Sequence, residues 1–243
     1  MRAFVVGNGP SLNDTPLDLL EGEVSYGVNA IHLLYDQTDW RPTNLVIGDL
    51  DRAHMSWIDD LRYAPWFVDD RVKRFLEIIK ANDCQIHIRG AYQKWAERLL
   101  GKRDNISYFD VCTHHSRSIT NTIADKAPDS WHFPQICRWG GTVTMAIQLA
   151  MQAEYKPLYM IGCDLGYEPG TDNHFTDDYY EAIDDDKAFN LNAVIANAHA
   201  LANSQWEIYN AGVGGTLEAY ERVELKELFD DELRFYSGPD SHG

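Results

Sequence analysis

Short apolar runs alternate with amphipathic stretches along most of the chain. Runs with the length and residue types of buried strands occupy residues 3–6, 24–28, 45–47, 85–88, 106–109, 158–161 and 206–209. Several are apolar at nearly every position, which is typical of parallel strands covered on both faces. Helical spacing is found over residues 70–82, 92–100, 142–152 and 186–203. The alternation predicts an α/β fold, a Rossmann-like, doubly wound and mostly parallel sheet with helices on both faces.

The same pattern indicates one domain over residues 1–236. Within it, residues 112–138 are rich in Ser, Thr, His, Asp and Pro and have no clear periodicity. Connections of this length are usually lids or binding loops, so we interpret 112–138 as a long loop or lid insertion. Residues 237–243 are polar and turn-forming, and we expect a disordered tail there.

Composition limits the classes of partner. The hydrophobic share of 44% in 243 residues is sufficient for a large core, and the formal net charge is −17. This charge argues against general binding to nucleic acid or to anionic membranes, which require a basic face. An anionic ligand would have to be held by backbone N–H groups, a few arginines or a metal ion.

The cysteine pattern and the hydropathy of the sequence indicate the cellular compartment. The 4 cysteines form no Cys-x-x-Cys pair, which is typical of thiols in a reducing compartment. No signal peptide precedes the first apolar run, and no run approaches the roughly 20 apolar residues of a membrane span. We therefore expect a soluble, cytoplasmic protein without a membrane span. The sequence leaves open whether it forms a homo-oligomer.

The first apolar run stops at Gly-Asn-Gly-Pro-Ser, residues 7–11. Gly7 and Gly9 permit a sharp bend or the close approach of another group, and Ser11 is a suitable cap for a following helical turn. This is neither a Walker loop nor a G-x-G-x-x-G motif. One interpretation is a nucleotide or phosphate contact through backbone amides and the Asn8 side chain. The alternative is a purely structural turn.

A second candidate anion site precedes the apolar stretch at 142–152. Residues 138–142 read Arg-Trp-Gly-Gly-Thr. Glycines before a helix leave free N–H donors at the positive end of its dipole. Gly140, Gly141 and Thr142 could therefore bind a phosphate there, with added charge from Arg138.

Asp49 and Asp51 lie in Gly-Asp-Leu-Asp, directly after a predicted strand. On an extended backbone the two carboxylates point the same way and could share a Mg²⁺ ion. An Asp-rich turn explains the pattern equally well.

The segment Cys-Asp-Leu-Gly-Tyr at 163–167, followed by His174, carries the strongest chemical signal. Asp164 follows a predicted strand and is expected beside the pocket, together with Tyr167. A histidine in the following polar loop could fold over that pocket and remove a proton from a hydroxyl group. The alternative is a solvated loop histidine.

Three segments resemble one bacterial and archaeal group, the motility accessory factors and the related 6-hydroxymethylpterin diphosphokinase-like proteins. They are VVGNGPSL, IGCDLGY with its downstream His, and NAGVGGTLEAYERVELKEL. The resemblance runs from residue 4 to about residue 229. It implies a Rossmann-like fold that binds a nucleotide.

A more distant resemblance is to bacterial sialyltransferases, which use CMP-sialic acid and also begin with GNGPSL. It implies contacts of Asn8, Gly9 and Ser11 with the nucleotide and its phosphate. It further implies that Asn29 contacts the nucleotide and that Gly141 and Thr142 hold the cytidine side of the pocket. Asp164 would fix the ribose or cytosine, and His174 would be the general base. Those enzymes carry a longer lid between the Asp and the His, and Tyr167 is among the candidates for its tyrosines.

The resemblances support a first hypothesis and leave two alternatives open. The first is a glycosyltransferase, sialyltransferase-like, that moves a nonulosonic-acid-type sugar from a CMP-activated donor to an acceptor. The second is a Mg²⁺-dependent pterin- or thiamin-type diphosphokinase with Asp49 and Asp51 as metal ligands. The third is a non-catalytic nucleotide-binding protein.

Overall fold

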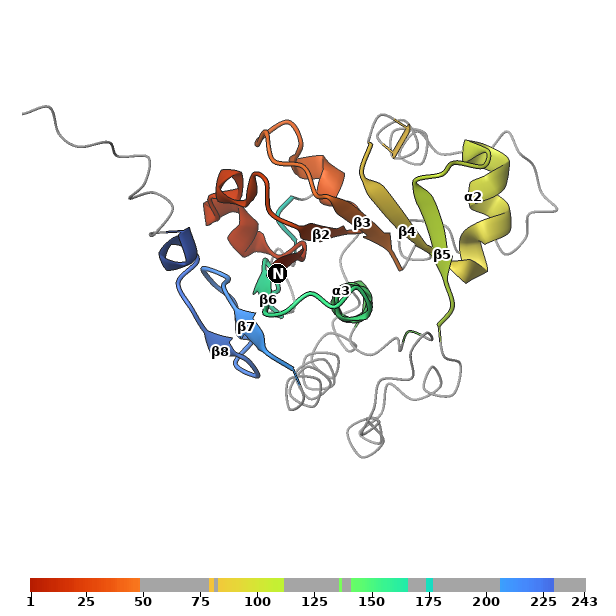
Figure 1. Cartoon of the computed structure of the whole chain (residues 1–243). Helices are drawn as coiled ribbons and strands as arrows, with labels where there is room; N and C mark the ends of the chain where they lie inside the picture. Colours follow the sequence, from red (N-terminus) through yellow and green to blue (C-terminus); the bar gives the residue numbers. More distant parts are fainter. Residues whose placement is uncertain are drawn as a thin grey trace, which may run out of the picture.

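The computed structural model describes residues 1–48, 79–80, 83–111, 136, 141–165, 174–176 and 206–229. In these parts an eight-stranded sheet forms with every strand pair parallel. The strands are β1 (Ala3–Val6), β2 (Ser25–Val28), β3 (Asn44–Ile47), β4 (Gln85–Arg89), β5 (Ile106–Phe109), β6 (Leu158–Ile161), β7 (Ile208–Asn210) and β8 (Glu221–Arg222). Their order across the sheet is β5-β4-β3-β2-β1-β6-β7-β8 (Figure 1).

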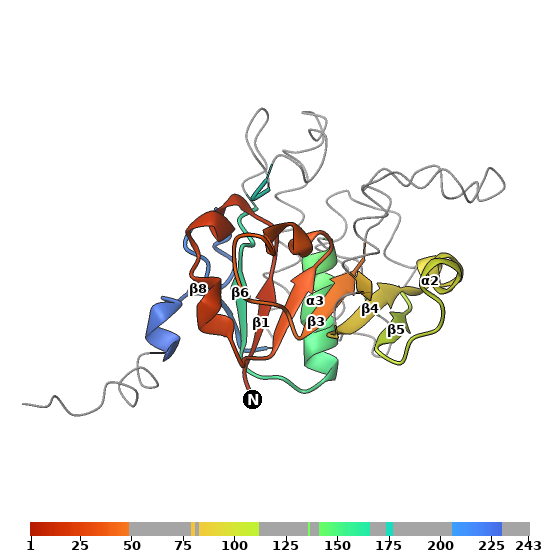
Figure 2. The ribbon, with the colours of Figure 1, turned by 90° about the horizontal axis from the view of Figure 1, so that it is seen from above.

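Helical elements lie on both faces of the sheet. The α-helices are α2 (Gln93–Leu100) and α3 (Thr142–Gln152), and the 3₁₀ turns are η1 (Pro10–Asp14), η2 (Leu17–Leu20), η3 (Ile31–Leu34), η6 (Gly90–Tyr92) and η9 (Lys226–Phe229). In Figure 2 the turns of the first 34 residues lie in front of the strands and α3 lies behind them. The predicted α/β, doubly wound fold is confirmed.

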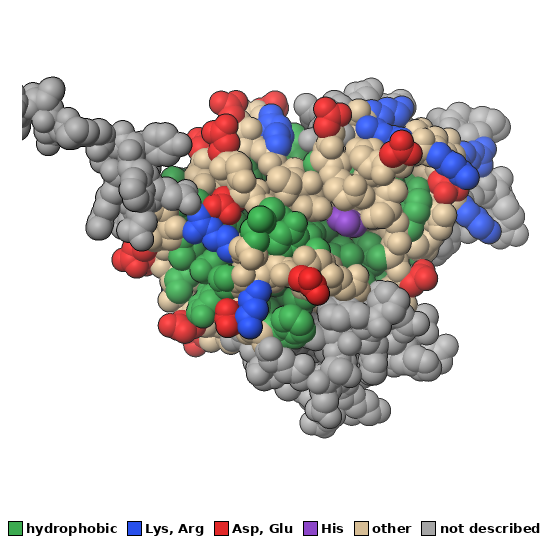
Figure 3. Space-filling model, viewed as in Figure 1, with side chains coloured by type: hydrophobic (Ala, Val, Ile, Leu, Met, Phe, Trp, Pro, Cys, Tyr) green, Lys and Arg blue, Asp and Glu red, His purple; other side chains and the backbone are tan. Residues whose placement is uncertain are grey.

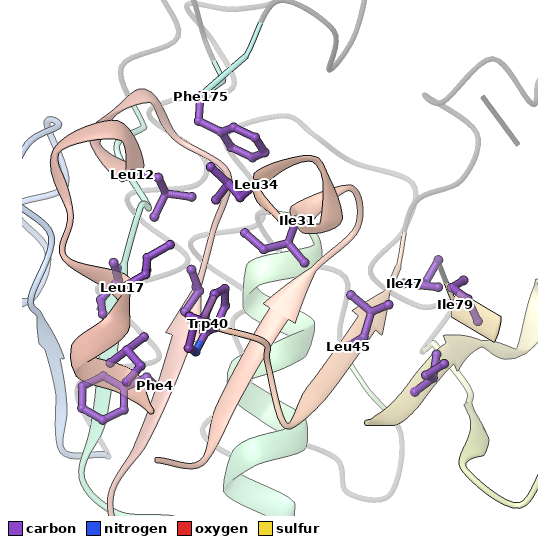
Figure 4. Close-up of a cluster of buried hydrophobic side chains, with 14 of the residues drawn as sticks. Phe4, Leu12, Leu17, Ile31, Leu34, Trp40, Leu45, Ile47, Ile79 and Phe175 are labelled. Carbon is purple, nitrogen blue, oxygen red and sulfur yellow. The ribbon is translucent and has the colours of Figure 1, made fainter. Parts of the chain in front are cut away.

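Strand periodicity divides the core into two layers. Phe4 and Val6 of β1 point to the face covered by η1, η2 and η3 (Figure 4), whereas Ala3 and Val5 point to the face covered by α3. Successive strand residues face opposite sides, so a four-residue apolar strand contributes equally to both layers. Helix α3 is apolar or buried almost all round, as expected of a helix within a core.

Most predicted elements are found in place. β7 begins two positions after the predicted start at residue 206, and β8 was not predicted. The predicted helix at 92–100 corresponds to α2, and that at 142–152 to α3. The predicted helix at 186–203, the tail at 237–243 and nearly all of the 112–138 insertion lie outside the described residues. So does 70–82, apart from the helical residues 79–80.

A polar cluster lies on the α3 face, on β3, β4 and β5. The His87 ring meets the Asn44 side-chain oxygen at 3.1 Å through Nε2 and the Ser107 hydroxyl at 2.9 Å through Nδ1. It also stacks on Tyr26, with ring centroids 6.1 Å apart. Burial lowers the pKa of His87 to about 4, so the ring is neutral at physiological pH.

Arg2 fastens η9 to the start of β1. Its guanidinium lies 4.7 Å from the centre of the Phe229 ring and donates a 2.7 Å hydrogen bond to the Leu228 carbonyl. The same guanidinium pairs with Glu23. Figure 3 shows the molecule in the view of Figure 1; on this face, basic and acidic side chains of the described residues are interspersed.

Candidate functional site

The strand order creates a switch point between β1 and β6. After β1 the chain builds the sheet outward through β2 to β5, and after β6 it builds in the opposite direction. In open α/β sheets, ligands bind in the crevice at the carboxyl ends of such diverging strands. The loops that leave β1 and β6, residues 7–11 and 162–165, meet at this point.

The glycines of the first loop are required by its contact with the second loop. The Gly7 amide donates to the Ile161 carbonyl and the Gly9 amide to the Gly162 carbonyl, each at 2.8 Å. A Cβ on Gly7 would lie 2.4 Å from the Gly162 carbonyl oxygen. The predicted close approach at this loop is thus present, and the approaching group is the backbone after β6.

Ser11 and Asp164 lock the two loops together. The Ser11 amide donates to Asp164 Oδ2 at 2.7 Å, and the Ser11 hydroxyl donates to Oδ1 at 2.5 Å. Both residues are 9% exposed. Among the described residues, the Asp164 carboxylate is held by these two hydrogen bonds from Ser11. The carboxylate occupies the start of η1, where a phosphate was expected to meet the Ser11 amide.

The two asparagines hold neighbouring strand ends in position. Asn8 is buried and its side-chain amide donates to the Val28 carbonyl at 2.9 Å. Asn29 has a left-handed backbone (φ 45°), which asparagine tolerates better than most residues. Its side-chain amide donates to the Thr142 hydroxyl at 3.0 Å, and its oxygen accepts from the Gly48 amide at 3.3 Å. Asn29 therefore ties the ends of β2 and β3 to α3.

Helix α3 begins at this edge without a side-chain cap. Gly141 has φ 92°, and a Cβ there would meet nothing within 4 Å. Thr142 is buried at the first helical position. The first-turn amides of α3 thus lie beside Asn29, on the same edge as the first loop.

His174 lies against the first loop because its neighbour Phe175 is anchored there. The Phe175 amide donates to the Asn8 carbonyl and the Asn13 side-chain amide donates to the Phe175 carbonyl, both at 3.1 Å. The Phe175 ring is buried next to Leu12 and Leu34 (Figure 4). Phe175 was not among the predicted site residues, although an aromatic residue beside a loop histidine was a usable signal.

Burial sets the protonation state of His174. It lowers the pKa of the imidazole to about 4, against an opposing contribution from a hydrogen bond with the Asn8 backbone. The ring is therefore neutral near pH 7. A neutral imidazole at the β1–β6 switch point can accept a proton from a hydroxyl group.

No protein-family model matches the chain, and neither a curated protein nor a solved structure was found to match it.

A third loop, which follows β7, also contacts Asp164. The Thr216 amide donates to the Asp164 carbonyl at 2.6 Å. Gly215 has φ 83°, and a Cβ there would lie 2.3 Å from Asp164 Cα. Asn210 shapes the start of this loop, since its side chain accepts from the Gly212 amide at 3.0 Å and donates to the Leu217 carbonyl at 2.8 Å. Three loops, after β1, β6 and β7, therefore converge on Asp164.

The structure brings together most of the predicted site residues that it describes. Gly7, Asn8, Gly9, Ser11, Asp164 and His174 lie at the β1–β6 switch point, and Asn29, Gly141 and Thr142 lie beside it. The predicted Asp49, Asp51, Arg138, Gly140 and Tyr167 lie outside the described residues. Among the described side chains, no three of His, Cys, Asp or Glu gather as around a metal ion. No helix in the described ranges has the length and apolar character to cross a membrane.

Proposed function

We propose that the chain is a glycosyltransferase that uses a CMP-activated nonulosonic-acid-type sugar, with the donor in the β1–β6 crevice and His174 as general base. The observation that carries the proposal is the position of His174. The ring is held at the first loop by its hydrogen bond with Asn8 and by the buried neighbour Phe175. A base fixed at a ligand-binding edge is the arrangement that transfer to a hydroxyl group requires.

The reaction is an inverting displacement. His174 removes the proton of the acceptor hydroxyl as that oxygen forms a bond to the anomeric carbon. The bond between the anomeric carbon and the phosphate oxygen breaks, and CMP leaves with the electron pair. The amides at the start of α3, at Gly141 and Thr142, are the groups we assign to the developing charge on the phosphate.

The assignment of Asp164 changes in this proposal. Both of its carboxylate oxygens accept hydrogen bonds from Ser11, so we assign it a positioning role in place of a direct contact with ribose or cytosine. It holds the first loop against the second, and this contact shapes the crevice that receives the donor.

The test measures CMP release from CMP-activated sugars in the presence of sugar acceptors. His174→Ala should lower kcat by about 10²- to 10⁴-fold, because a positioned general base contributes that much. The affinity for CMP should change little. His87→Gln is the matched control, since His87 is also a half-buried histidine with a lowered pKa but lies on β4, away from the β1–β6 switch point.

The pH profile provides a second readout. The base must be neutral to accept a proton. As the pH is lowered, kcat/KM should therefore stay constant through pH 6.5 and decrease only as the pH approaches 4. Unchanged transfer in His174→Ala would overturn the proposal. So would turnover of ATP with Mg²⁺ and a pterin-type alcohol in place of CMP donors, the result expected of a diphosphokinase.

A further inference from the structure

The loop 212–215, after β7, is arranged around a single arginine. Arg222 donates to the Gly212 carbonyl at 2.7 Å, to the Gly214 carbonyl at 3.3 Å and to the Gly215 carbonyl at 3.4 Å. Arg222 follows the loop on β8, the neighbouring strand. One guanidinium therefore fixes the direction of three peptide groups.

This arrangement directs the amides of the same peptides to the opposite side. In a trans peptide the N–H points away from the preceding C=O, so the amides of Val213, Gly215 and Thr216 face away from Arg222. The Thr216 amide confirms this direction, because it donates to the Asp164 carbonyl at 2.6 Å. The Val213 and Gly215 amides thus point to the side on which the loop after β6 lies.

Within the described part of the chain these two amides are donors without an acceptor. Among the hydrogen bonds of the described residues, none uses the N–H of Val213 or Gly215. Gly215 and Val213 are also exposed, so a ligand can reach them. The loop is close to the proposed site, since a Cβ on Gly214 would lie 3.3 Å from Ser11 Cβ and one on Gly212 would lie 3.7 Å from the Gly162 nitrogen.

From this geometry we propose that the Val213 and Gly215 amides bind an oxyanion of the ligand, either the phosphate of the nucleotide or the carboxylate of the sugar. Backbone amides that converge on one side of a glycine-rich loop form anion sites in many proteins. Arg222 behind the loop adds positive charge in a chain whose formal net charge is −17. The inference rests on the proposed function, because it assigns a subsite to the same ligand.

The amide resonances of the full-length, isotope-labelled protein test the inference directly. CMP, cytidine, N-acetylneuraminic acid, its methyl ester and inorganic phosphate are titrated separately. Shifts of the Val213 and Gly215 amides with CMP but not cytidine would support the inference and identify the phosphate as the anion. Shifts with the sugar acid but not its ester would support it and identify the carboxylate.

Failure of the inference and failure of the proposed function give different results. If CMP shifts the amides of residues 7–9, Ser11 and Asn29 while no anion shifts Val213 or Gly215, the anion site is overturned and nucleotide binding stands. If only inorganic phosphate shifts Val213 and Gly215, the anion site is supported and the CMP donor is overturned. If no ligand shifts any of these amides, both are overturned.

A pair of variants gives the energetic test. Val213→Pro removes the N–H donor, whereas Val213→Ala keeps it and shortens only the side chain. We expect Val213→Pro to weaken binding of the anion about tenfold or more, which corresponds to one hydrogen bond to a charged group. Val213→Ala should bind as the parent does. Equal affinity of the two variants, with both shown to be folded by circular dichroism, would overturn the inference.

Discussion

Replacement of Ser11 by alanine should destabilise the fold through Asp164. The carboxylate is 9% exposed and accepts from the Ser11 hydroxyl and the Ser11 amide. Ser11→Ala removes the hydroxyl donor and keeps the amide donor. Asp164 Oδ1 then loses its partner in a site where little water can replace it.

Ser11→Ala is expected to lower the free energy of unfolding by about 2 kcal/mol. A hydrogen bond to a charged group contributes roughly 1.5–3 kcal/mol, and Ser11 makes this bond at 2.5 Å. The second bond, from the Ser11 amide at 2.7 Å, remains and limits the loss. For a domain of this size, 2 kcal/mol lowers Tm by about 4–8 °C.

Equilibrium unfolding in urea measures the change in the free energy of unfolding for Ser11→Ala, for Asp164→Asn and for the double variant. The side-chain amide introduced by Asp164→Asn can still accept from the Ser11 backbone N–H and donate to the Ser11 hydroxyl, so this single change should cost less than Ser11→Ala. The double-variant cycle should return a coupling energy above about 1 kcal/mol. A loss below about 0.5 kcal/mol in Ser11→Ala, the range of ordinary surface changes, would refute the reasoning.

Three further predictions concern packing, pH and the C-terminal turn. Gly9→Ala should lower the free energy of unfolding in urea by more than about 2 kcal/mol, because its Cβ would lie 2.4 Å from Asp164 Oδ2. The control is Gly22→Ala, where φ is 80° and the space is open, so only backbone strain of about 1 kcal/mol is expected. Equal losses in the two variants would contradict the steric cause. Because burial lowers the pKa of His87 from 6.5 to about 4, the native state binds fewer protons than the unfolded chain between these values, and stability falls by up to about 3 kcal/mol as pH decreases through this window. His87→Gln should reduce the proton uptake on unfolding at pH 5 by about one, and an unchanged slope would show that the ring is solvated. Arg2→Met should release η9, which hydrogen exchange would detect as lost amide protection confined to residues 226–229.

The sheet and the edge at which the candidate site lies were predictable because they depend on local patterns. Four-residue apolar runs such as 3–6 and 158–161 can be buried only when both faces are covered, and this implies parallel strands with helices between them. Once the strands are parallel, their carboxyl ends share one edge. Gly7, Asn29 and Asp164 therefore had to lie near one another, as they do.

The hydrogen-bond partners of the site residues were not predictable from such local patterns. Ser11 and Asp164 are 153 positions apart, and their pairing depends on β1 lying directly beside β6. No local pattern assigns Arg222 to the carbonyls of loop 212–215 either, because β8 is a two-residue strand without periodicity. Asn8 and Asn29 were expected to face a nucleotide, but a side-chain amide satisfies a neighbouring carbonyl or hydroxyl group equally well, and sequence does not distinguish these partners from a ligand.

The central position of β1 also determines the order in which the sheet can be completed. β2 is synthesised soon after β1 and can pair with one edge, whereas Leu158, which pairs with Ala3 on the other edge, emerges much later. At roughly 5–20 residues per second, β1 waits on the order of ten seconds or more with that edge open on the ribosome. An open, apolar edge strand is a template for pairing with another chain. Productive folding of this protein in the cell therefore depends on keeping the free edge of β1 covered until β6 arrives.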